Sequence, residues 1–167
     1  VVRPTVTDAV LKSLFDGRIR GIRFTVGNPQ TDVVSIDMIE HLARRIADFG
    51  WHVQLHIPAQ AIIDNEEMLK RLPTPIVIDH LGRLLPSTGV DHPAYRVIRT
   101  LIDRGRTWVK VAAIHLNTKI GPPTYQDAAA IAKAYIKAVP ERLVWGTNWP
   151  HSSQKEKPND ALLFDLL

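Results

Sequence analysis

The chain has 167 residues, of which 45% are hydrophobic and 23% charged, and this composition is typical of one soluble domain with a buried core. It has no cysteine, which excludes disulfides and thiolate catalysis and is consistent with a cytoplasmic protein. No apolar run approaches the roughly 20 residues that span a bilayer. The net charge of +4 is scattered, without a basic and aromatic cluster. We therefore expect a small-molecule ligand and neither a nucleic-acid nor a membrane partner. The oligomeric state stays open.

The N-terminal half alternates β-rich runs with segments of helical periodicity. Val1–Val2 is interpreted as the tail of a strand. The elements expected next, in chain order, are a helix over Thr5–Phe15, a strand over Arg18–Val26, a helix over Ser35–Phe49, a strand over Trp51–Ile57 and a short helix over Asn65–Arg71. Thr5 and Asp8 are placed to cap the first helix.

The same alternation continues to the end of the chain. The expected elements are a strand over Pro75–Asp79, a helix over His92–Arg104, a strand over Thr107–Ala113, a helix over Thr124–Val139 and a strand over Arg142–Thr147. Thr124 with Asp127 resembles a capping box for the last of these helices. Gly105 and Pro140 are placed to end helices.

Regular alternation of apolar strands with helices predicts an α/β fold with a parallel sheet covered by helices. A doubly wound sheet and a (β/α)₈ TIM barrel both satisfy this order. We expect residues 1–167 to form one domain, because no linker or repeat interrupts them. The chain contains neither of the glycine-rich phosphate-binding motifs. In both folds the functional residues gather at the carboxyl ends of the strands.

Polar side chains mark those strand ends. The candidates are Arg23, His56, Asp79 with His80, Lys110 followed by His115, and Asn148 followed by His151. Four of the seven histidines lie at or just beyond a strand end. An imidazole there binds a divalent metal or moves a proton near neutral pH, although a single histidine at such a place is usually a hydrogen-bonded structural group. Together the four favour an active site.

Five segments carry a family resemblance: "RGIRF" at 20–24, "WHVQLH" at 51–56, "PIVIDHLGR" at 75–83, "WVKV" at 108–111 and "VWGTNWPH" at 144–151. They resemble the amidohydrolase superfamily, in particular its 2-pyrone-4,6-dicarboxylate lactonase-like branch. The resemblance covers essentially the whole chain and implies a (β/α)₈ barrel. Residues 1–167 then run from the end of barrel strand 3 through strand 8. Strands 1 and 2 are absent, and so is the family's His-x-His motif at the end of strand 1. We therefore expect this sequence to be part of a longer chain, or its missing strands to come from elsewhere.

The resemblance also implies roles. It implies hydrolysis of a lactone or related carbonyl compound by water. His80 matches a catalytic histidine, and Asn148 matches the catalytic aspartate. His56 matches a metal ligand of metal-dependent relatives, which implies one divalent ion (zinc or manganese), or none as in the pyrone lactonase branch. Arg23 matches a residue that grips a substrate carboxylate, and His151 lies where it can contact substrate.

Several alternatives stay open at this point. His115 lies in the polar loop 113–126, which we expect to cover the pocket and contribute to substrate binding. Asn148 is an engineered substitution, marks a natural pseudoenzyme, or leaves the base role to another group such as His80. The other functional hypotheses are a metal-dependent decarboxylase or hydratase of the same superfamily, and a catalytically impaired barrel that binds a small acid.

Overall fold

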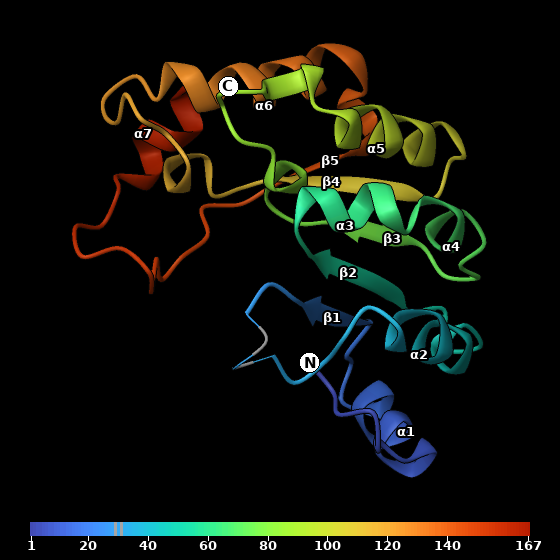
Figure 1. The fold of residues 1–167 in the computed structure, drawn as a ribbon. Coiled ribbons are helices and arrows are strands. Elements are labelled where there is room, and N and C mark those ends of the chain that lie inside the picture. The colour runs from blue at the N-terminus through green and yellow to red at the C-terminus, as the bar shows by residue number, and fades with distance from the viewer. Residues whose placement is uncertain (29, 31) are drawn as a thin grey trace.

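The computed structural model describes residues 1–28, 30 and 32–167. Five parallel strands form one sheet in the order β1-β2-β3-β4-β5, so each strand pairs with its neighbour in sequence (Figure 1). The strands are β1 (Gly21–Thr25), β2 (His52–His56), β3 (Ile76–Ile78), β4 (Thr107–Val111) and β5 (Leu143–Trp145). The predicted α/β class and the parallel sheet are confirmed, and every predicted strand from 18 to 147 is found at about its expected place.

In the described residues, seven α-helices precede, connect and follow the strands. They are α1 (Asp8–Asp16), α2 (Met38–Ile46), α3 (Ala59–Asp64), α4 (Glu66–Lys70), α5 (Pro93–Asp103), α6 (Gln126–Ala138) and α7 (Asp160–Asp165). Short 3₁₀ turns cover His80–Arg83, Gly89–Asp91, Ile114–Leu116 and Pro140–Arg142. Among the described residues no helix is both long and apolar enough to cross a membrane.

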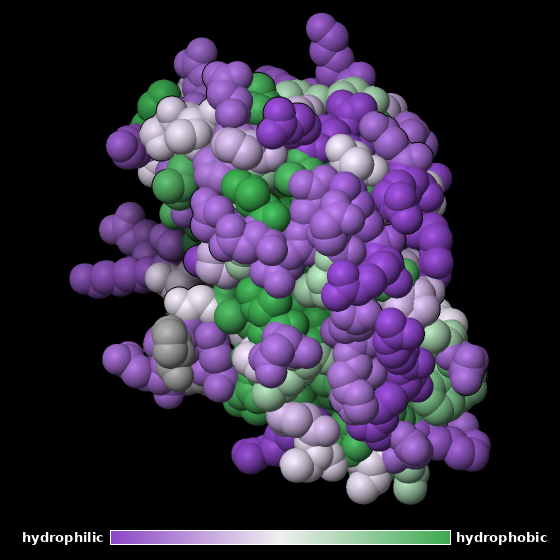
Figure 2. All heavy atoms as spheres, turned by 45° about the vertical axis from the view of Figure 1, so that its right-hand side comes forward, coloured by the Kyte–Doolittle hydropathy of each residue, from purple (hydrophilic) through white to green (hydrophobic). Residues whose placement is uncertain are grey.

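The core lies between one face of the sheet and the helices. Along β1 and β2 every second side chain is buried, beginning with Ile22 and Phe24 and continuing with Val53 and Leu55. The residues between them are only partly buried, so the second face of the sheet stays open to polar groups. The side that carries α2, α4 and α5 is mostly hydrophilic (Figure 2), as expected where amphipathic helices turn their apolar stripe inward.

Three local predictions were wrong. Residues 1–7 contain no strand, so Val1–Val2 is not a strand tail here. Helix α1 is capped by Thr7, whose hydroxyl accepts from the Val10 amide at 3.3 Å, and not by Thr5. Helix α6 has no capping box, because Asp127 instead accepts from the Thr118 hydroxyl and the Lys119 amide and so closes the preceding loop.

The sequence also failed to reveal α3. Pro58 directly follows the strand predicted over Trp51–Ile57, and it occupies the N-cap of α3 with φ −57° and ψ 147°. Proline is compatible with the start of a helix as well as with the end of a strand, because its fixed φ suits both places and no amide hydrogen is needed. The connection between β2 and β3 therefore holds two short helices, α3 and α4.

Candidate active site at the carboxyl ends of the strands

The second face of the sheet ends in a row of charged and polar side chains. Arg23 of β1 lies beside Gln54 of β2 in the sheet register, and Thr25 lies beside His56. Asp79 and His80 follow β3 directly, and Lys110 lies in β4. Since the strands are parallel, these groups approach the same edge of the sheet, as the sequence predicted.

Asp79 is the centre of this row and is only 1% exposed. Its Oδ2 lies 2.8 Å from Nη2 of Arg23, and its Oδ1 lies 3.6 Å from Nζ of Lys110. The Gln54 amide nitrogen donates to both carboxylate oxygens at 2.9 Å. A buried carboxylate needs such partners because burial alone disfavours its charge. Asp79 therefore holds one guanidinium and one ammonium group at this edge of the sheet.

Two neutral imidazoles lie next to this row. The His56 and His80 rings meet edge to face, with centroids 4.9 Å apart, and Nδ1 of each ring is buried without a hydrogen-bond partner. Burial, followed by the nearby His80, Arg83 and Arg23, lowers the pKa of His56 to about 4. Burial also lowers the pKa of His80, although Asp79 acts in the opposite direction. Both rings are neutral at pH 7 and able to accept a proton.

The backbone after β3 explains how His80 is presented. His80, Leu81, Gly82 and Arg83 all have positive φ, from 49° to 73°. A side chain at Gly82 would lie 2.4 Å from Cδ1 of Ile98 on α5. Glycine at position 82 therefore leaves room for the end of the Ile98 side chain, and it adopts a positive φ with less strain than other residues. The strained turn is held against α5 and projects His80 at the strand end.

His115 and His151 form a second pair. Their ring centroids are also 4.9 Å apart, and both side chains are buried, with exposures of 8% and 3%. Nε2 of His151 lies 2.8 Å from Oδ1 of Asp160 at the start of α7. Neither ring nitrogen of His115 has a partner, and burial, followed by the charge of His151, lowers its pKa to about 4. Asp160 thus orients His151.

Asn148 lies three residues before His151 in sequence, and its side chain forms no hydrogen bond with either histidine pair in the described part of the chain. It is partly exposed, has φ 74°, and its carbonyl accepts from the His151 amide at 3.1 Å. Its carboxamide is therefore free to meet a ligand. Arg23 with Asp79, and His56 with His80, form direct contacts; His151 contacts His115. The roles given to these residues stay predictions.

The sequence predicts Asp79 only as a polar residue at a strand end and assigns no role to Gln54, so the central place of both residues was not predicted. The alternation of side chains along the strands could have indicated their place. Gln54 and His56 alternate with buried residues of β2, so they lie on the same face of the sheet as Arg23. Lys110 likewise alternates with buried residues of β4 and is only partly buried.

A metal site is not completed by this part of the chain. Among residues 1–28, 30 and 32–167, no three histidine, aspartate or glutamate side chains are arranged to hold an ion. His56 and His80 offer two unpartnered nitrogens, which is one fewer than a catalytic zinc normally receives from protein.

The buried neutral His115 predicts a pH dependence of stability. Its pKa of about 4 lies below the ordinary value of 6.5, so the unfolded chain binds its proton first as pH falls. The free energy of unfolding should decrease from pH 6.5 towards pH 4, and His115→Gln should flatten that decrease. Urea midpoints measured between pH 8 and 4.5 test this. His41→Gln, on the exposed side of α2, is the control; an unchanged slope in His115→Gln contradicts the prediction.

A parallel α/β sheet with charged and imidazole groups where its strands end has the organisation of proteins that bind small ligands at that edge. Residues 1–167 match the family model described as amidohydrolase, and the chain belongs to the amidohydrolase family.

Relatives of known name agree with this assignment. The chain is 33% identical over 171 residues to a 4-sulfomuconolactone hydrolase of Hydrogenophaga intermedia, across 99% of this chain and 56% of that protein. It is 31% identical over 175 residues to a 2-pyrone-4,6-dicarboxylate hydrolase of Comamonas testosteroni, across 99% and 57%. An apo crystal structure from Agrobacterium tumefaciens matches with a TM-score of 0.88 at 28% identity, across 99% and 58%. The chain thus spans just over half the length of these relatives.

Proposed function

We propose that the protein hydrolyses a lactone, or a related carbonyl ester, of a small anionic substrate at the carboxyl ends of its strands. The observation that carries this proposal is the excess of positive charge around Asp79. Arg23 and Lys110 face one buried carboxylate, and Arg83 lies near enough for its charge to lower the pKa of His56. Two named relatives are hydrolases of anionic cyclic esters, which supports the same substrate class here.

We propose further that the five strands form an arc of a (β/α)₈ barrel, corresponding to strands 4 to 8. Two observations support this. The sheet is entirely parallel and follows sequence order, as successive barrel strands do. Val144 and Trp145 of β5 are exposed by 46% and 40%, as expected if further strands of the barrel cover this edge.

Arg23 is suited to hold the substrate anion. Its Nη2 bonds Asp79 and its Nε donates to the Thr25 hydroxyl at 3.1 Å, which fixes the plane of the guanidinium. Its remaining N–H groups are available for a carboxylate or sulfonate. The side chain is 38% exposed, so a ligand reaches it from the open face.

His80 is the proposed proton acceptor. Water attacks the lactone carbonyl carbon, its proton passes to the neutral imidazole, and the ring C–O bond breaks as that proton is delivered to the leaving oxygen. Asn148 takes no proton near neutral pH, but its N–H groups can stabilise the negative charge that develops on the carbonyl oxygen. The product is an open-chain hydroxy acid.

Arg23 provides the test. Arg23→Gln should raise KM for an anionic lactone about 10–100-fold, because a charged hydrogen bond to the substrate is lost. KM for a neutral lactone should change by less than about threefold. Arg23→Lys keeps the charge and should be intermediate for the anionic substrate. Arg44→Gln, an exposed arginine of α2, is the matched control. A similar increase in KM for the anionic and the neutral lactone would show that Arg23 does not select the anion.

A second candidate function is binding of a small acid without turnover, and the amide at Asn148 favours it. Calorimetry with anionic lactones and their product acids separates the two. Binding that depends on Arg23, with no hydrolysis by the parent or by an aspartate form of Asn148, supports the binding function.

A further inference from the structure

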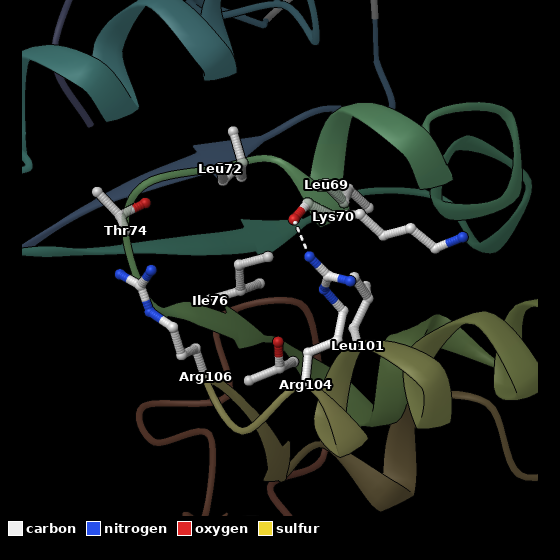
Figure 3. A pocket seen from close by; sticks show the side chains of 9 residues that line it. Leu69, Lys70, Leu72, Thr74, Ile76, Leu101, Arg104 and Arg106 are labelled. Carbon is white, nitrogen blue, oxygen red and sulfur yellow. Dashed lines mark hydrogen bonds between the residues drawn. The ribbon is translucent and has the colours of Figure 1, made fainter.

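A second pocket lies at the opposite end of the sheet. It has a volume of about 280 Å³ and lies where β3 and β4 begin, whereas the candidate active site lies where they end. Its polar wall consists of Lys70, Thr74, Arg104, Arg106 and Thr107. Thr74 and Arg106 lie on one side of it and Arg104 on the other (Figure 3). None of these residues belongs to the site described above.

Thr74 is the first indication of a ligand. It is 2% exposed, and its hydroxyl is buried without a hydrogen-bond partner in the described structure. Leaving a buried hydroxyl unpaired costs about 1–3 kcal/mol, so such groups normally have a partner. The hydroxyl faces the pocket above the Arg106 guanidinium (Figure 3).

The two arginines are the second indication. Arg104 donates from Nη2 to the Lys70 carbonyl at 3.0 Å, and Arg106 donates from Nη2 to the Pro73 carbonyl. These bonds anchor each guanidinium but leave most of its five N–H donors unused. Within the described residues neither arginine forms an ion pair with a carboxylate, so their positive charges are not neutralised by direct contact.

The neighbouring charges do not change this balance. Lys70 already pairs with Glu66 at 2.7 Å and with Glu67 at 2.8 Å. The charge of Arg104 contributes to the lowered pKa of Glu67. The Glu67 side chain is 80% exposed, however, so it is surrounded by water and does not neutralise the pocket. The net charge that faces the pocket is therefore that of Arg104 and Arg106.

We infer that this pocket binds a small tetrahedral oxyanion of the phosphate type. Two guanidinium groups from opposite sides match a dianion, and the Thr74 hydroxyl needs the acceptor that such an ion supplies. The volume of about 280 Å³ leaves room for such an ion together with bound water. The ligand would bridge the loops that lead into β3 and β4.

Inorganic phosphate tests the inference by thermal unfolding at constant ionic strength. At ten times the dissociation constant, phosphate should raise the melting temperature by roughly 3–6 °C. Arg104→Gln and Arg106→Gln should each weaken phosphate binding about tenfold or more. Thr74→Val should also weaken it about tenfold without lowering the melting temperature of the free protein, because valine removes a buried hydroxyl that has no partner.

Three controls separate this pocket from other effects. Arg23→Gln should keep the phosphate shift, since that arginine belongs to the opposite end of the sheet. Arg44→Gln removes the same charge from an exposed pair and should also keep it. Acetate at equal ionic strength should bind at least tenfold more weakly than phosphate. The inference is overturned if phosphate gives no shift, if Thr74→Val binds as the parent does, if the shift depends on Arg23, or if acetate equals phosphate.

Discussion

Asn148→Asp is expected to increase kcat for an anionic lactone by about 10²–10⁴-fold, the usual contribution of a well-placed general base. Aspartate and asparagine have nearly the same shape, so the φ of 74° and the carbonyl bond to the His151 amide should persist. The change adds a carboxylate that takes the proton of the attacking water. In the parent, we propose, His80 takes that proton.

The measurement is kcat with parent, Asn148→Asp and Asn148→Ala over pH 5–9. The alanine form should be slower than the parent if the carboxamide N–H groups stabilise the carbonyl oxygen. Asn148→Asp with His80→Gln shows whether the carboxylate suffices as the base. If the folded aspartate form is no faster than the parent, Asn148 does not occupy the position of a general base.

Asp79→Asn is expected to lower the free energy of unfolding by about 3 kcal/mol, the lower end of the range for breaking a buried ion pair. Asp79 is 1% exposed and has Arg23, Lys110 and Gln54 as partners. The amide leaves both cations without their carboxylate. We expect the low end because Arg23 is 38% exposed and Lys110 33%, so water stabilises part of their charge.

Urea unfolding at pH 7 measures this effect. Asp16→Asn is the matched control, because Asp16 pairs with Lys12 at 3.3 Å while both side chains are exposed, and such surface pairs contribute at most about 1 kcal/mol. If Asp79→Asn and Asp16→Asn destabilise the protein equally, the contacts of Asp79 with Arg23 and Lys110 contribute no more to stability than a surface ion pair. Asp79→Asn should also weaken binding of an anionic substrate, because Arg23 loses the contact that holds it in place.

Much of the fold was accessible from the sequence because the local signals agree with one another. Apolar strands bounded by Gly17, Gly50 and Gly105 alternate with helices that have one apolar stripe, so the strand positions and their parallel arrangement follow from the pattern. The failures lie where one residue type allows two structures. Pro58 ends a strand and also begins α3, and Asp127 bonds to a loop although it is placed to cap a helix.

The sequence by itself determined the fold class, the amidohydrolase family and the edge of the sheet at which Arg23, His56 and His80 lie, because parallel strands end together. Only the tertiary structure decided which groups meet. It made Asp79 the common partner of Arg23 and Lys110, and it paired His115 with His151. It also left the Thr74 hydroxyl unpartnered beside Arg106. These contacts depend on side-chain distance and burial between segments far apart in the chain, which residue spacing does not encode.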